Sequence, residues 1–307
     1  GEPLEKAAAL GHDLDTAKEL LGSAREKLLT ARNSRAALGR DDKVLVSWNA
    51  LMIQGMAYAG LHFGRPDLIA SAASAVDFIR HRLFHNGRLL ASYKDGRSKY
   101  LAYLDDYAFL INALFTLMEA KWRDSDLHFA CELAETLLDH FEDESQGGFY
   151  FTADDHEALI QRPKPFLDES MPAGNGIAAT ALLRLGHLIG DIHFIDAAEK
   201  TLLAGWQLMK RYPSAHGAML CALQEHQHGG ELFVLRGDEG VLKEWRSRLL
   251  SGYHPHRLVV SIPPTAVNLP ESLQQKHPAG EAVAYHCKGL HCLPPITRIE
   301  ALAAHGA

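Results

Sequence analysis

Residues 147–176 read GGFYFTADDHEALIQRPKPFLDESMPAGNG. This segment begins with a glycine pair and an aromatic, β-prone run, and it ends in a Pro/Gly turn that opens onto an apolar helix predicted over 177–189. A stretch of about thirty residues without helical period is uncommon, and such loops are usually functional or disordered. The aromatic residues and the turn chemistry favour a functional loop. The alternative is a surface hairpin that only connects two helices.

Helix signals recur on both sides of this loop. Apolar residues at helical spacing, with Asp or Pro near the start, predict helices over 13–37, 66–83, 100–120, 125–141, 192–211 and 215–226. Residues 43–63 begin extended and then become helical, whereas residues 87–98 predict a hairpin with Asp95-Gly96 at its turn. Repeated helix pairs predict a helical array or a closed α/α toroid.

The composition changes at Gly229. Three β-prone runs (231–236, 257–262 and 282–287) and a helix over 239–250 predict a βαβ unit followed by a further strand. We therefore divide the chain into a helical part, residues 1–228, and a small α/β subdomain, residues 229–307.

The net charge, the apolar runs and the cysteine count of the chain argue against several functional classes. The net charge of -7 and the lack of a Lys/Arg cluster argue against a nucleic-acid partner. No apolar run is long enough to predict a membrane span, and the opening GEPLEKAAAL does not resemble a signal peptide. Four cysteines in 307 residues do not form a disulfide scaffold, so we expect a reducing, cytoplasmic setting. No phosphate loop or dinucleotide fingerprint occurs, so we expect no cofactor.

Three carboxylates are candidate catalytic groups. Asp105 and Asp106 lie at the start of the helix over 100–120, and Asp168 lies in the long loop. Because neighbouring helix positions point about a hundred degrees apart, one acid could face a cavity while the other caps the helix. Paired carboxylates across a pocket are typical of glycoside chemistry. The alternative is that these acids only stabilise helix starts.

Aromatic and amide side chains could form a sugar-binding surface around these acids. Each alone is more often a packing residue, but they recur at the ends of successive helices. The candidate substrate-binding residues are Trp48, Asn49, Tyr107, Tyr150, Arg162 and Asn175.

The segment YHCKGLHC, residues 285–292, is a second candidate site. Cys287 and Cys292 with the interleaved His286 and His291 could bind zinc, although the spacing is unusual for a structural site. The spacing also differs from that of a thioredoxin-type redox pair. We therefore expect reduced, buried thiols and no metal.

Five blocks of sequence in order resemble the YyaL family of spermatogenesis-associated, thioredoxin-domain proteins. The blocks are residues 41–53, 103–114, 147–155, 162–176 and 284–295. The resemblance implies a mainly α fold: an (α/α)6-toroid-like helical-hairpin array, present as a partial toroid, with a small C-terminal α/β subdomain. It also implies kinship with N-acylglucosamine 2-epimerases and six-hairpin glycosidases. Family members carry an N-terminal thioredoxin-like domain that this chain lacks.

Two functional hypotheses follow. In the first, the chain is a carbohydrate-active enzyme of glycosidase or epimerase type, with Asp105 or Asp106 and Asp168 as acid/base groups. Epimerase-type sites rely on paired histidines, which do not stand out here. In the second, the chain is a non-catalytic scaffold that binds a ligand or peptide for the missing thioredoxin-like part. Partners would be a carbohydrate, that missing part, or a second copy.

Overall fold

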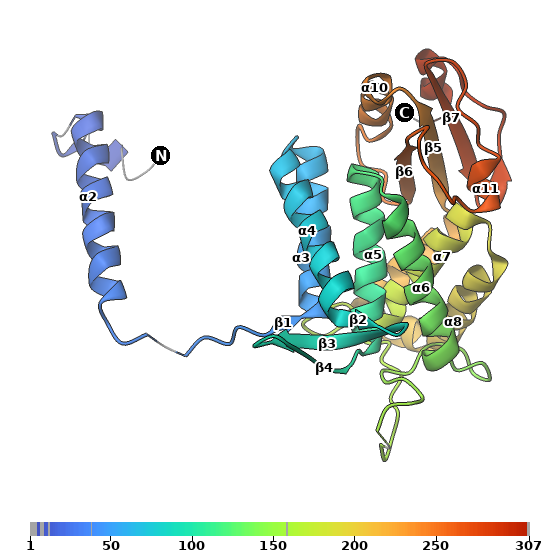
Figure 1. The fold of residues 1–307 in the computed structure, drawn as a ribbon, viewed down its shortest axis with the longest axis horizontal. Coiled ribbons are helices and arrows are strands. Elements are labelled where there is room, and N and C mark those ends of the chain that lie inside the picture. The colour runs from blue at the N-terminus through green and yellow to red at the C-terminus, as the bar shows by residue number, and fades with distance from the viewer. Residues whose placement is uncertain (1–4, 7–8, 12, 38, 158, 306–307) are drawn as a thin grey trace. The chain divides into compact units, whose positions relative to one another are not determined.

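The computed structural model describes residues 5–6, 9–11, 13–37, 39–157 and 159–305. It divides into two compact units, residues 1–42 and 43–307 (Figure 1). The first unit contains α2 (Leu14–Asn33), and Asp13 caps it by accepting hydrogen bonds from the backbone N–H groups of Asp15 and Thr16. This confirms the predicted first helix.

The second unit is built from helical hairpins. Its main helices are α3 (Val46–His62), α4 (Pro66–Leu83), α5 (Leu104–Ala120), α6 (Asp124–Phe141), α7 (Gly174–Ile189), α8 (Ile192–Arg211) and α9 (Gly217–His228). Helices α3, α5, α7 and α9 pack side by side as an inner layer, and α4, α6 and α8 pack against their partners in the hairpins. This alternation is the partial α/α-toroid arrangement that the sequence predicts.

The two layers differ in sequence for a physical reason. The inner helix α5 is apolar on nearly all sides and is buried along almost its whole length. The outer helix α8 buries one stripe at helical spacing, which includes Phe194, Ala198, Leu202 and Met209. A helix covered by neighbours on several sides needs apolar residues all round, whereas a surface helix needs only one apolar face.

A small sheet lies at one end of the helices (Figure 1). Its strands are β1 (Val44–Leu45), β2 (Phe84–His85), β3 (Arg88–Lys94) and β4 (Arg97–Leu101). Asp95 and Gly96 connect β3 to β4 with φ angles of 51° and 77°. Positive φ at both central residues is the geometry of a tight hairpin turn, so the predicted hairpin is confirmed.

The C-terminal strands form a second sheet at the opposite end of the helices (Figure 1). Its order is β6 (Arg257–Ile262), β5 (Glu231–Gly237), β7 (Ala282–Lys288) and β8 (His291–Cys292). Strands β5 and β6 are parallel and flank α10 (Glu239–Leu249) in the chain, whereas β7 is antiparallel to β5. The predicted βαβ unit with a further strand is confirmed.

Both faces of this sheet are covered. Leu232, Val234 and Val260 join the large core of the helices, and Phe233 and Leu235 form a second core with α10. The short elements η1 (Pro213–Ala215), α11 (Glu271–Gln274) and η2 (Ile299–His305) complete the unit. The domain boundary at residues 228/229 stays a prediction, because α9 ends there but the large core continues across it.

The long loop between α6 and α7 has no strand among its described residues. The β-prone run after Gly148 forms only an isolated bridge between Glu142 and Phe149. In place of strand pairing, hydrogen bonds from the side-chain amide of Asn175, in the first turn of α7, stabilise the loop. Its Oδ1 accepts from the Phe149 N–H at 2.7 Å, and its Nδ2 donates to the Phe149 and Pro165 carbonyls at 3.0 and 2.8 Å.

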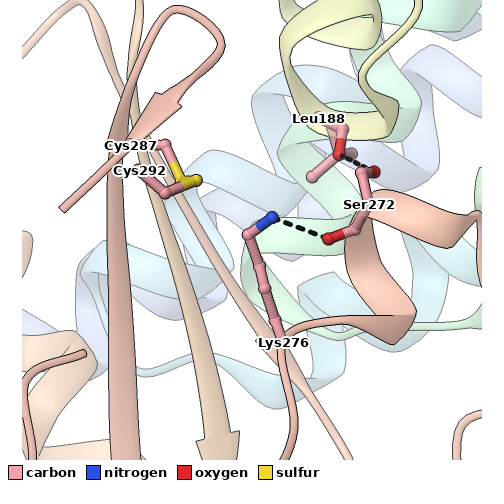
Figure 2. The surroundings of a disulfide bond; sticks show 5 residues. All are labelled: Leu188, Ser272, Lys276, Cys287 and Cys292. Atoms are coloured by element: carbon pink, nitrogen blue, oxygen red, sulfur yellow. Dashed lines mark hydrogen bonds between the residues drawn. A yellow bond between two sulfur atoms is a disulfide. The ribbon is translucent and has the colours of Figure 1, made fainter. Parts of the chain in front are cut away.

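The expectation of reduced thiols at Cys287 and Cys292 is wrong. The two residues form a disulfide (Figure 2). The register of β7 and β8 places them directly opposite each other, and a linear spacing of cysteines cannot reveal that register. In the same region the Ser272 hydroxyl of α11 donates a hydrogen bond to the Leu188 carbonyl of α7 at 3.3 Å (Figure 2). This bond connects the two helices.

The described residues include no helix with the length and apolar character required to cross a bilayer. The cytoplasmic setting stays a prediction.

Replacing Asn175 by Ala should destabilise the protein by about 2–4 kcal/mol, because it leaves buried backbone groups without partners. Urea unfolding followed by circular dichroism measures this change. Asn49→Ala is the matched control, because Asn49 makes a single bond to the Leu45 carbonyl. We expect it to cost about 0.5–1 kcal/mol. Equal effects of the two substitutions would contradict the role of Asn175.

Thiol counting tests the disulfide. Denatured, unreduced protein should react with maleimide only at Cys131 and Cys221, which are the free cysteines. After reduction, peptide mass spectrometry should find label at Cys287 and Cys292 as well. Labelling of all cysteines without reductant would contradict the pairing.

Candidate functional site

Two cavities lie on either side of the loop segment 169–172, which lines both of them. The first has a volume of about 670 Å³ and the second about 590 Å³. Both volumes are in the range of small-molecule sites.

The first cavity combines apolar walls with a few polar groups. Its aromatic and aliphatic lining includes Phe151, Phe166, Leu208 and Tyr212, and its ionisable lining includes Asp105, Lys164, Glu169 and His216. Apolar walls with a small number of placed polar groups are typical of ligand pockets.

Asp105 is the candidate catalytic residue that this cavity contains. Its Oδ1 is buried and has no hydrogen-bond partner among the described residues. Burial raises the pKa of Asp105 to about 6, and the neighbouring Asp106 carboxylate adds to the shift. Gly174 lies directly against this oxygen, and a Cβ atom at that position would collide with it. The first residue of α7 must therefore be small for Asp105 to occupy this site.

Asp106 has a different environment. It is buried, and its oxygens accept hydrogen bonds from the backbone N–H groups of Ser47 at 2.8 Å and Tyr103 at 2.9 Å. These bonds tie the start of α3 to the start of α5. Burial raises the pKa of Asp106, and the two backbone bonds act in the opposite direction.

Asp168 also binds backbone groups. Its Oδ1 accepts from the Ala173 N–H at 2.8 Å and its Oδ2 from the Ala218 N–H at 3.0 Å. The carboxylate thus joins the first turns of α7 and α9, where exposed N–H groups favour a negative charge. Asp168 lines the second cavity, not the first.

The other predicted ligand-binding residues lie outside both cavities. Trp48 is exposed on α3, and Tyr107 is fully buried, with its hydroxyl accepting from the Leu89 N–H at 2.9 Å. Asn49 donates to the Leu45 carbonyl at 2.7 Å. Asn175, as described above, holds the loop. The predicted sugar-binding surface of these residues is thus not assembled around Asp105.

Tyr150 and Arg162 pack on each other within the loop. The Arg162 guanidinium lies 4.2 Å from the centre of the Tyr150 ring and donates to the Thr152 carbonyl at 2.7 Å. The Tyr150 hydroxyl donates to Asp143, which also pairs with Lys164 at 2.7 Å. Lys164 holds the pKa of Asp143 well below its usual range. This cluster gives the loop its shape.

His216, which is not among the predicted site residues, lines the first cavity from the start of α9. Its Nδ1 lies 2.7 Å from the Tyr212 carbonyl, which can only accept, so Nδ1 carries the hydrogen. Nε2 is then the ring atom left for a ligand. Glu169, in the loop, lines the same cavity and is exposed. The position of Glu169 directly after Asp168 in the loop was a usable signal.

The second cavity lies along the inner helices. Gln54, Asn112, Thr180 and Arg184 contribute from α3, α5 and α7. The Oδ1 of Asn112 is buried without a hydrogen-bond partner among the described residues. Arg184 forms an ion pair with Glu225 at 3.0 Å, so its charge is compensated.

One cluster in the described part of the chain has the spacing of a metal site. It consists of His140, Asp154 and Asp155. Arg88 forms an ion pair with Asp155, and His140 Nδ1 bonds Asp154 at 2.8 Å. These partners already account for the three side chains, so we assign no metal there.

No protein-family model matches the chain. Among curated proteins, human spermatogenesis-associated protein 20 is 31% identical over 310 residues, which cover 95% of this chain and 39% of the relative. The mouse protein of the same name is 31% identical over 76% of this chain and 31% of its own length. The chain thus spans about two fifths or less of the length of these curated relatives.

Solved structures are similar over roughly half of the chain. Cellobiose 2-epimerase from Spirochaeta thermophila has 20% identity and a TM-score of 0.45 over 53% of this chain and 43% of that one. A family 105 glycoside hydrolase from C. acetobutylicum has 15% identity and a TM-score of 0.44, covering 59% and 56%.

The match along nearly the whole chain leads to one conclusion: this chain is a homologue of part of spermatogenesis-associated protein 20.

Proposed function

We propose that the chain binds a carbohydrate in the first cavity and that Asp105 is the acid/base group there. The observation that carries the proposal is a buried carboxylate oxygen without a partner, in the wall of a cavity of about 670 Å³. A buried ionisable group without a structural partner is destabilising, and such groups concentrate at functional sites.

The chemistry of Asp105 suits proton donation to a sugar oxygen. A general acid works best when its pKa is near the operating pH, and burial raises the pKa of Asp105 to about 6. Glycoside hydrolysis also needs a second carboxylate, and Glu169 lines the same cavity from the loop. His216 Nε2 is an alternative base, which would suit an epimerase.

The charges of the cavity favour a neutral sugar over a uronic acid. Its acidic lining consists of Asp105 and Glu169, and its single lysine, Lys164, is already paired with Asp143. Among the described residues that line the cavity, a carboxylate ligand would therefore meet negative charge and no lysine or arginine without an ion-pair partner. Phe151 and Tyr212 supply aromatic surface against which a sugar ring can pack.

A second candidate function is ligand binding without catalysis. Asp106 and Asp168, which the sequence predicts as catalytic, both bind backbone N–H groups of helix starts. Because two of the three predicted catalytic acids make structural hydrogen bonds, this arrangement favours a non-catalytic scaffold, in which the cavity binds a ligand or peptide without converting it.

Asp105→Asn should stabilise the protein at neutral pH. Because the folded-state pKa is raised from 3.8 to about 6, stability is lost as pH rises through this window, and the substitution removes that loss. The melting temperature of the variant should exceed that of the wild type above pH 6 and approach it near pH 4. Differential scanning calorimetry across pH measures this. A constant difference at all pH values would contradict a buried, titrating Asp105.

Sugar binding and turnover test the proposed function directly. A thermal-shift panel of neutral mono- and disaccharides and uronic acids identifies a ligand, and we expect the neutral sugars to give the larger shifts. With that sugar as substrate, Asp105→Asn should lower turnover about 10²- to 10⁴-fold and leave binding largely intact. The wild-type rate should fall as pH rises through about 6, since the acid then loses its proton.

Asp139→Asn on the exposed side of α6 is the matched control and should change neither binding nor rate. Binding without turnover in the wild type would favour the scaffold. No binding of any sugar by folded protein would refute the carbohydrate proposal.

A further inference from the structure

A third cavity lies where the α/β subdomain meets the end of α5. Its volume is about 430 Å³, and residues at the ends of β5 and β6, such as Gly237 and Ser261, line it together with Lys121 and Trp122. Strands β5 and β6 are parallel and run in the same direction into this cavity. In α/β units, ligands bind in the crevice outside the carboxyl ends of parallel strands.

Basic side chains line this cavity from two elements. Lys121 directly follows α5, whereas Lys243 and Arg246 lie three residues apart on α10 and so share one face of that helix. The acids in the lining are Asp238 and Glu239. Asp238 is engaged as the cap of α10, where its side chain accepts from the Gly240 N–H at 2.9 Å.

Arg246 is poorly compensated for a partly buried guanidinium. Its Nη1 donates to the carbonyls of Glu119 and Ala120 over long distances of 3.4 and 3.3 Å. In the part of the chain that the structure describes, no carboxylate pairs with it at ion-pair distance. Burial lowers the pKa of Arg246, and the nearby Glu239 and Glu119 carboxylates act in the opposite direction.

A hydroxyl and apolar surface complete the cavity. The Oγ of Ser261 is buried and has no hydrogen-bond partner among the described residues. Trp122, Leu242, Pro263 and Pro264 form apolar walls. The cavity therefore offers donors and positive charge to one end of a ligand and flat apolar surface to the rest of it.

We propose that this cavity binds a small phosphomonoester. The lining holds two acids beside the three cations, and Asp238 caps the start of α10, where the helix dipole offsets its charge. Against Glu239 alone the three cations leave an excess of two positive charges, which a dianionic phosphate matches better than a single carboxylate does. The Ser261 hydroxyl can donate to a phosphate oxygen, and the walls at Trp122 and Pro263 can pack on a ring. None of these residues lines the carbohydrate cavity, so the two proposals stand on separate observations.

Calorimetric titration of the full chain tests this site. The probes are adenosine 5′-monophosphate, inorganic phosphate, and adenosine as the matched compound without phosphate. We expect the monophosphate to bind at least about tenfold more tightly than adenosine and to weaken with added salt. Lys121→Gln and Arg246→Gln should each weaken it by about ten- to a hundredfold, the usual effect of losing a bond to a charged group.

Arg248→Gln is the control on the same helix. Arg248 lies outside the cavity and donates to the Ile299 carbonyl, so its loss should leave binding unchanged. Because Lys121 is exposed, Lys121→Gln keeps the test valid even if Arg246→Gln unfolds the protein. The proposal is overturned if neither the monophosphate nor phosphate binds at concentrations up to about 10 mM. It is also overturned if both charge variants bind as tightly as the wild type.

Discussion

The hydrogen bonds of the Asn175 amide are the contacts on which the loop between α6 and α7 depends. The described residues of the loop between α6 and α7 form no paired β-strands, so the buried backbone N–H and C=O groups of the loop need side chains as hydrogen-bond partners. Asn175 supplies three hydrogen bonds to residues 149 and 165, two well-separated positions within the loop. The segment 169–172, which separates the two cavities, follows directly from this anchored part. The wall that the loop contributes to both cavities is thus anchored by one buried side chain in the first turn of α7.

The carboxylates near helix starts have two different hydrogen-bonding environments in this structure. Asp106 and Asp168 each accept two backbone N–H groups and thereby join neighbouring inner helices. Asp105, next to Asp106 in the chain, has a buried oxygen without such a partner among the described residues. The difference arises because adjacent residues on a helix point in different directions. One position faces the start of α3, and the other faces a cavity.

The α/β subdomain extends the helical core instead of standing apart from it. One face of its sheet packs on the inner helices, and the carboxyl ends of its parallel strands meet the end of α5. Arg246 spans this junction and donates to the last carbonyls of α5. The junction therefore places basic side chains of α10 next to the polar end of a helix, and the third cavity forms there.

The sequence by itself determined the elements with strong local signals. The bounds of α4, α8 and β6 follow from apolar period and end signals, and the β3–β4 hairpin follows from Asp95-Gly96. Only the tertiary structure decided which acid lacks a partner, that Tyr107 is buried while Trp48 is exposed, and that Cys287 pairs with Cys292. The reason is physical: local signals set the backbone conformation of a segment, but hydrogen-bond partners and burial depend on residues distant in sequence, such as Ser47 for Asp106 and Ala218 for Asp168.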